Sequence, residues 1–89
     1  MPKPKPNPNL SASLLEVVDN QLRDNNPPET RQTFSRLVAS GYSEKDARQL
    51  IGQVVLSEIF NVMQRKEPYD ETRFIEALKR LPLLPEEND

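Results

Sequence analysis

The 89-residue sequence contains neither cysteine nor histidine, and it has only two glycines. Without cysteine, disulfide bonds and thiolate chemistry are excluded, and without histidine the chain lacks the most common general base and metal ligand. Ser–His and Cys–His nucleophilic pairs are therefore impossible. A glycine-rich phosphate loop is excluded as well, because Gly41 and Gly52 stand alone. We accordingly predict that the protein is not an enzyme and binds neither a metal nor a cofactor.

Long hydrophobic runs and an excess of positive charge are also lacking. No apolar run approaches the roughly 18 to 20 residues that span a membrane, and no apolar segment of a secretory signal follows the first lysines. The formal net charge of −2 disfavours a nucleic-acid binder, which normally carries a clustered basic face. The short basic pairs Lys3 with Lys5 and Arg65 with Lys66 are typical of solvated surface. We therefore expect a cytoplasmic protein without a membrane partner.

Proline, by contrast, is abundant, and its nine residues mark the ends of the expected elements. Residues 1–9 have proline at every second position through Pro8, which favours an extended, polyproline-like arm that we expect to be disordered. Binding of this arm to a proline-recognising groove is disfavoured, because no apolar anchors flank the prolines. Residues 86–89 carry three acids and form an acidic tail that we expect to fray.

Residues 10–85 show helical periodicity and no alternating pattern typical of a strand. The four expected helices cover residues 11–24, 27–40, 44–66 and 71–81. Each is preceded or begun by a side chain that can accept a hydrogen bond from a free backbone N–H, namely Ser13, Asn26, Ser43 and Asp70. Gly41 suits the left-handed conformation that closes a helix. The sequence predicts an all-α, four-helix bundle-like single domain with a long central third helix.

The third expected helix is apolar over roughly two-thirds of its circumference, so it must be covered on more than one side. One wide sector contains Ala47, Leu50, Ile51, Val54, Val55, Ile59 and Val62. A neighbouring stripe contains Leu56, Phe60 and Met63, with Gly52 beside it. Either the fourth helix covers this stripe through Phe74 and Leu78, or the stripe contacts another chain.

We predict that Gly52, Leu56, Phe60 and Met63 form an interface. The simplest partner is a second copy of the chain in a two-fold homodimer. Glycine in mid-helix permits the close approach of another backbone, either of the same chain or of a second subunit.

Glu58 falls in the middle of the apolar sector, and Gln21 falls inside the apolar arc of the first helix. A buried carboxylate is costly unless it is paired or protonated. Gln21, Arg48 and Arg65 are candidate partners, and we predict a buried polar pair of Gln21 and Glu58. This pair is either structural or the centre of a polar pocket in a small-ligand or regulatory domain.

Several turns and caps resemble those of one protein family. They are Asn7-Pro8-Asn9-Leu10, Asn20-Gln21-Leu22, Asn26-Pro27-Pro28-Glu29-Thr30, Gly41-Tyr42-Ser43 and Ile51-Gly52. Together they resemble a family of small bacterial all-helical domains of unknown function. Members of that family often carry histidines near the first helix and before the Ile-Gly pair, where this chain has Ser11, Leu14, Leu15, Arg48 and Gln49. The resemblance implies a helical fold and a bacterial setting, and it implies no activity.

The function that we predict is protein–protein interaction or self-association. A small-ligand domain is the alternative, and weak nucleic-acid binding ranks third.

Overall fold

The computed structural model describes residues 11–85 of the chain. The described residues form four α-helices, α1 (Ala12–Asp24), α2 (Pro28–Ala39), α3 (Glu44–Arg65) and α4 (Glu71–Arg80), and contain no strand. With 22 residues α3 is the longest helix, as predicted. The all-α fold class is confirmed. The expected N-terminal arm and acidic tail lie outside the described residues.

Three helices begin at a residue whose side chain accepts a hydrogen bond from the first turn. Ser43 Oγ accepts from the Asp46 N–H at 3.0 Å, and Asp70 Oδ1 accepts from the Arg73 N–H at 3.2 Å, so both predicted caps are confirmed. The first helix is capped by Ser11, not by Ser13. Because α1 already begins at Ala12, Ser13 lies inside the first turn and cannot precede it.

The prolines between α1 and α2 leave no side-chain cap on α2. Pro27 occupies the cap position and Pro28 is the first helical residue, where its missing N–H costs no hydrogen bond. The expected cap, Asn26, ends α1 instead, because its N–H donates to the Gln21 carbonyl. Asn25 makes this possible by adopting the left-handed conformation, with φ of 51°.

Gly41 ends α2 as predicted. Its φ of 105° is a conformation open mainly to glycine. The Gly41 N–H donates to the Val38 carbonyl, and the Tyr42 N–H donates to the Leu37 carbonyl. These two bonds form a Schellman motif, which satisfies free carbonyl groups at the helix end. The chain then turns at once into α3.

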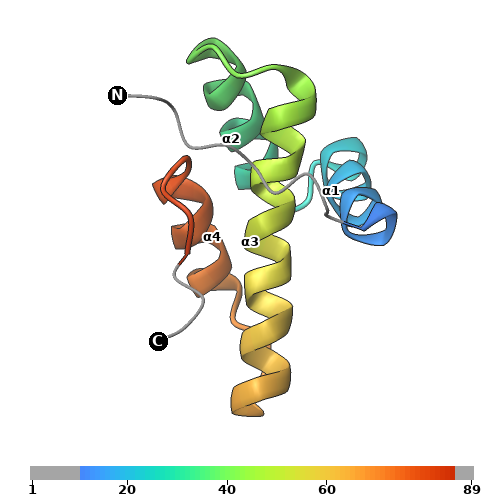
Figure 1. Cartoon of the computed structure of the whole chain (residues 1–89), viewed down its shortest axis with the longest axis vertical. Helices are drawn as coiled ribbons and strands as arrows, with labels where there is room; N and C mark the ends of the chain where they lie inside the picture. The colour runs from blue at the N-terminus through green and yellow to red at the C-terminus, as the bar shows by residue number, and fades with distance from the viewer. Residues whose placement is uncertain (1–10, 86–89) are drawn as a thin grey trace.

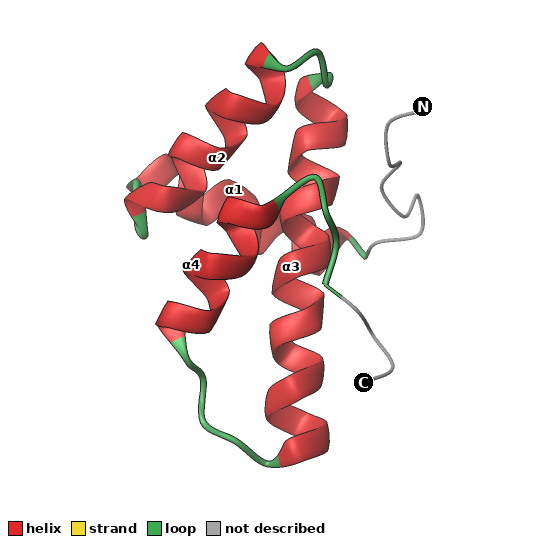
Figure 2. Ribbon diagram, turned by 90° about the vertical axis from the view of Figure 1, so that its left-hand side faces the viewer, coloured by secondary structure: helices red, strands yellow, loops and turns green. Residues whose placement is uncertain are grey.

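The helix α3 is the spine of the domain (Figure 1). It contacts each of the other three helices, with α1 on one side and α2 and α4 on the other. The loop after α3 leads back to α4, so these two helices are antiparallel neighbours (Figure 2). None of the helices in residues 11–85 combines the length and the hydropathy that a membrane crossing requires.

The core surrounds the N-terminal half of α3. Its buried side chains come from every helix and from the turns: Val18, Leu37, Tyr42, Ala47, Leu50, Ile51, Val54, Val55, Phe74, Leu78 and Leu81. Arg36 of α2 adds a polar link to α4, since its Nη1 donates to the Leu81 carbonyl at 2.7 Å and its Nη2 to the Leu78 carbonyl at 3.0 Å. The guanidinium thus adds hydrogen bonds to two carbonyl groups at the end of α4, where the helix itself supplies few donors.

Candidate functional site

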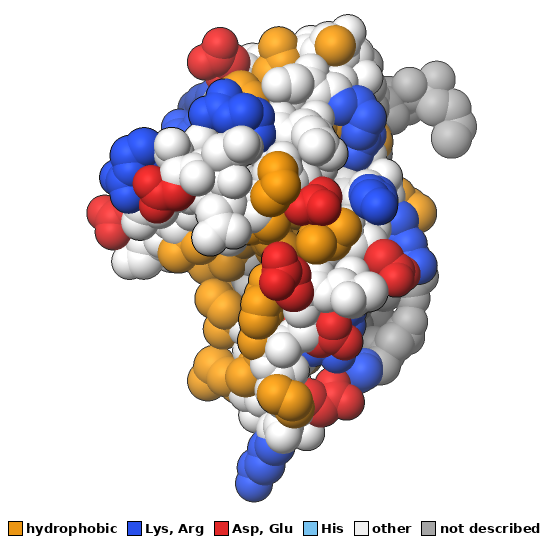
Figure 3. Space-filling view, turned by 180° about the vertical axis from the view of Figure 1, so that it is seen from behind, with side chains coloured by type: hydrophobic (Ala, Val, Ile, Leu, Met, Phe, Trp, Pro, Cys, Tyr) orange, Lys and Arg blue, Asp and Glu red, His pale blue; other side chains and the backbone are white. Residues whose placement is uncertain are grey.

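The C-terminal half of α3 exposes four large apolar side chains. The exposed fraction is 36% for Leu56, 42% for Ile59, 49% for Phe60 and 72% for Met63. At 100° per residue these four fall within one sector of the helix, and we call them the apolar face. Hydrophobic side chains gather over this lower part of the molecule in the view from behind (Figure 3).

The fourth helix does not cover the apolar face. Phe74 and Leu78, which the intrachain alternative assigned to that task, are buried in the core with exposed fractions of 2% and 0%. Ile59 was expected in the covered sector, yet it is exposed. The reason is geometric, because α1 lies across only the upper part of α3 (Figure 1).

Gly52 does not belong to the apolar face, because it is buried. It lies one turn after Arg48, whose Nη2 is 2.7 Å from Asp19 Oδ2 of α1. Residues four apart share one side of a helix, so Gly52 is on the side toward α1. The structure therefore favours close approach of a backbone within the same chain, and it removes Gly52 from the predicted interface.

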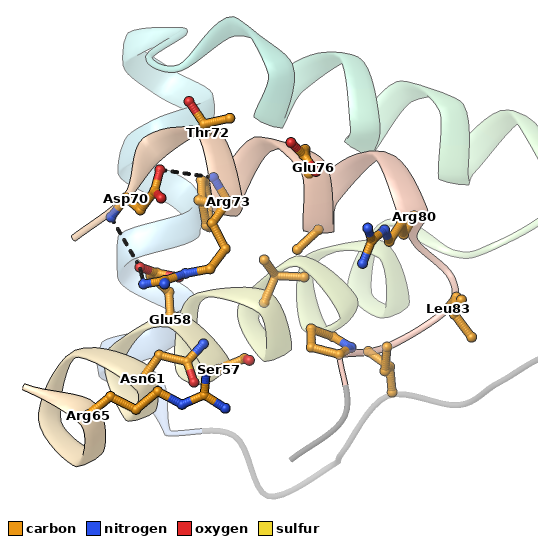
Figure 4. A pocket seen from close by; sticks show the side chains of 15 residues that line it. Ser57, Glu58, Asn61, Arg65, Asp70, Thr72, Arg73, Glu76, Arg80 and Leu83 are labelled. Carbon is orange, nitrogen blue, oxygen red and sulfur yellow. Dashed lines mark hydrogen bonds and ion pairs between the residues drawn. The ribbon is translucent and has the colours of Figure 1, made fainter. Parts of the chain in front are cut away.

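Glu58 is buried as predicted, and its partner is Arg73 of α4. Arg73 Nη2 donates to Glu58 Oε2 at 2.7 Å, and Arg73 Nε donates to Oε1 at 3.0 Å, which makes the pair bidentate (Figure 4). The Asp70 N–H also donates to Oε2, at 3.3 Å. The carboxylate is thus satisfied by two neighbours from one segment, and it ties α3 to the start of α4.

Sequence reasoning missed Arg73, although one signal pointed to it. A short connection makes two helices antiparallel neighbours. A residue two turns before the end of α3 then lies beside the first turn of α4, which contains Arg73. The three candidates that we considered included none from the fourth helix.

Gln21 has a different partner from Glu58. Thr30, which is fully buried, donates its hydroxyl to Gln21 Oε1 at 2.8 Å. Among the described residues no hydrogen bond joins Gln21 to Glu58, so the predicted polar pair is not formed. Both side chains nevertheless border one shallow hollow of about 340 Å³. Its other walls are apolar or aromatic: Val17, Val55, Ile59, Val62, Met63, Tyr69 and Phe74.

Two ionisable side chains near this hollow, Arg73 and Tyr69, have raised pKa values. The hydrogen bonds that Arg73 donates to Glu58 raise the pKa of Arg73, and the negative charges of Glu58 and Glu67 raise it further. Burial raises the pKa of Tyr69, and the negative charges of Glu71, Glu58 and Asp70 raise it further. The Tyr69 ring is tilted against the Phe74 ring, with 6.3 Å between centroids.

Within residues 11–85 no group of three or more acidic side chains is arranged to hold a metal ion. Comparison with known protein families, with curated proteins and with solved structures finds no significant match to this chain. The resemblance to a bacterial helical family therefore stays a prediction, and the function must be inferred from the molecule itself.

Proposed function

We propose that the protein is an interaction module that associates with a second copy of itself through the apolar face of α3. The observation that carries this proposal is the exposure of Leu56, Ile59, Phe60 and Met63 side by side on one helix. Single exposed apolar residues are common, whereas contiguous patches usually mark an interaction site. Burial of this patch would give association a hydrophobic driving force.

The charge of this region favours a second copy over a charged partner. Between Gln49 and Gln64 the only charged residue is Glu58, and Arg73 neutralises it. In a two-fold interface the same surface occurs on both subunits, so like charges near the axis would face each other. A neutral apolar face avoids that repulsion, and it offers a strongly charged partner nothing complementary.

The position of the face also suits a partner helix. The lower half of α3 extends past α1, so one side of it is left without a neighbouring helix (Figure 1). The hollow beside it adds Val17, Val62 and Tyr69 to the contact area. This additional contact area is needed, because stable interfaces bury about 800 Å² on each partner, which is more than four side chains supply.

Sedimentation velocity over a wide range of protein concentrations tests the proposal. The wild-type chain should show a reversible increase in mass with concentration. Phe60→Glu should be a folded monomer by circular dichroism and sedimentation, because it places a charge in the interface. Val38→Glu is the matched control, since Val38 is an exposed apolar residue of α2 that lies outside the face, and it should associate like the wild type.

A second variant separates loss of association from loss of fold. Met63 is the most exposed residue of the face, so Met63→Glu should leave the helical content unchanged and also abolish association. A wild-type chain that stays monomeric at every concentration would overturn the proposal. Equal association of the wild type and both face variants would do the same.

The alternative functions have less support. A small-ligand pocket around Gln21 and Glu58 would use polar groups that already have partners in the chain, namely Thr30 and Arg73. Nucleic-acid binding has no basic cluster on the apolar face to favour it, and the net charge of −2 opposes it.

A further inference from the structure

The hollow between α1 and the lower half of α3 suits an uncharged occupant. Apart from Gln21 and Glu58, its walls are apolar or aromatic. Neither of these two residues supplies an uncompensated charge, because Glu58 is paired with Arg73 and Gln21 Oε1 accepts a hydrogen bond from Thr30. A charged group placed in the hollow would lose its hydration without gaining a partner. The hollow therefore favours an apolar side chain.

Met63 has the properties of such a side chain. It lines the hollow, yet 72% of it is exposed, so it lies at the rim and has few contacts within its own chain. Methionine is unbranched and flexible, and it fills irregular apolar spaces well. Its sulfur also makes favourable contacts with aromatic rings, which Tyr69 and Phe74 supply in the hollow. Met63 of one copy is thus suited to the hollow of another.

The hollow runs along one edge of the apolar face. Ile59 and Met63 line it, whereas Leu56 and Phe60 line a separate groove at the other edge. Two helices related by a two-fold axis perpendicular to them are antiparallel, and the same edge of each copy then meets. An axis parallel to the helices would instead join opposite edges. Only the antiparallel arrangement brings Met63 to the hollow of the other copy.

The charge at the end of α3 favours the same arrangement. The helix ends in Arg65, and Lys66 follows it, so two cations lie just beyond the apolar face. Parallel helices would place each cation beside its own copy, and like charges that face each other oppose association. Antiparallel helices separate the two pairs of cations to opposite ends of the interface.

We propose that two copies pack their α3 helices antiparallel and that the Met63 side chain of each copy enters the hollow of the other. This arrangement rests on the self-association proposed above, and it assigns the occupant of the hollow. Because the exchange is reciprocal, each interface contains the contact twice. Val17 of α1 and Tyr69 before α4 then belong to the interface, although neither lies on α3.

A nuclear Overhauser measurement on a mixture of two samples of the chain tests the contact directly. One sample is deuterated except for ¹³C-labelled methionine methyl groups, and the other is unlabelled, so contacts of these methyl groups with carbon-bound protons arise between copies. The Met63 signal is assigned by its loss in Met63→Leu, because Met1 is the only other methionine. Contacts of the Met63 methyl group with Tyr69 or Val17 of the other copy are expected.

The same spectrum can overturn the arrangement. Contacts of the Met63 methyl group with Phe60 or Pro85 of the other copy, and none with Tyr69 or Val17, would show that opposite edges meet, since Phe60 and Pro85 line the other groove. Absence of any contact at concentrations where the chain associates would show that the hollow has a different occupant. The measurement does not depend on the folding of a substituted chain.

Two matched valines separate this arrangement from self-association in general. Val17 is 38% exposed and lines the hollow, whereas Val38 on α2 is 36% exposed and lies away from it. Val17→Glu should weaken self-association in sedimentation velocity by at least about tenfold, because it buries a carboxylate without a partner. Val38→Glu should associate like the wild type, and circular dichroism checks the fold of both variants.

The pattern of loss distinguishes the two proposals. Association that is lost in Phe60→Glu and unchanged in Val17→Glu would overturn the place of Met63 in the hollow and leave the proposed self-association intact. A wild-type chain that is monomeric at every concentration would overturn both. Equal weakening by Val17→Glu and Val38→Glu would also contradict the arrangement, because the effect would then not be specific to the hollow.

Discussion

The two halves of α3 are alike in composition and opposite in environment. From Ala47 to Val55 the apolar side chains are buried, whereas from Leu56 to Met63 most of them are exposed. The difference comes from their neighbours, since α1 and α2 pack against the upper part of the helix while the lower part has α4 on one side only. The apolar residues of a helix thus show how much of its surface needs to be buried. The positions of the other helices determine which of those residues stay exposed and available to a partner.

The largest expected effect comes from one substitution made in each half. Ile51→Ala removes a fully buried side chain and should lower the free energy of unfolding by about 2 to 5 kcal/mol. Ile59→Ala, at a half-exposed position of the same helix, should lower it by about 1 kcal/mol or less. Urea denaturation of both variants measures the difference. Equal losses would show that Ile59 is as fully covered as Ile51, and would remove the contrast between the halves.

A smaller effect is expected at the boundary between the halves, where Glu58 lies. Glu58→Ala should lower the free energy of unfolding by about 1 to 3 kcal/mol, because it leaves Arg73 with Glu67 as its remaining partner and removes the acceptor of the Asp70 N–H. Double-mutant cycles should give a non-additive result for Glu58 with Arg73. For Glu58 with Gln21 the two losses should add to within about 0.5 kcal/mol. Coupling of Glu58 to Gln21 alone would contradict the arrangement described above.

A third effect concerns the way α4 is held against α2 beside the upper half of α3. Arg36→Ala should lower the free energy of unfolding by about 1 kcal/mol, since Arg36 is an exposed residue and its hydrogen bonds are only partly buried. Thermal denaturation measures the loss, and Arg23→Ala is the control because Arg23 pairs only with the adjacent Asp24. If both variants lose the same stability, Arg36 does not hold the end of α4.

Local features of the fold were predictable from the sequence. Ser43, Asp70 and Gly41 act within a few residues of themselves, so their roles depend on little else. The burial of Glu58 followed from helical periodicity. The caps at Ser13 and Asn26 were wrong, because neighbouring residues compete for the same free N–H groups. Ser11 caps the start of α1, and the Asn26 N–H donates to the Gln21 carbonyl at the end of α1.

Features that depend on the packing of one helix on another were harder to predict. The Glu58–Arg73 pair joins α3 to α4, and the Arg36 cap joins α2 to α4 across more than 40 residues of sequence. The exposure of Ile59 and the burial of Gly52 both depend on where α1 crosses α3. Periodicity places a residue on a side of its helix, but it does not say which other element lies there.

The smallest expected effect is a shift in the titration of Tyr69, which lies beside the lower half of α3. Burial against this region raises its pKa above the ordinary value of about 10, and the charges of Glu71, Glu58 and Asp70 add to the increase. The folded chain therefore holds this proton to higher pH than the unfolded chain does. Its contribution to stability is full below pH about 10 and is lost as the pH rises through the pKa of the folded state. Absorbance titration of a Tyr42→Phe variant, in which Tyr69 is the only tyrosine, measures the shift, and the same chain in urea supplies the reference. Coincident titrations in the folded and unfolded chains would show that the hollow does not cover the ring. A pKa that increases with protein concentration would show that a second copy covers it further.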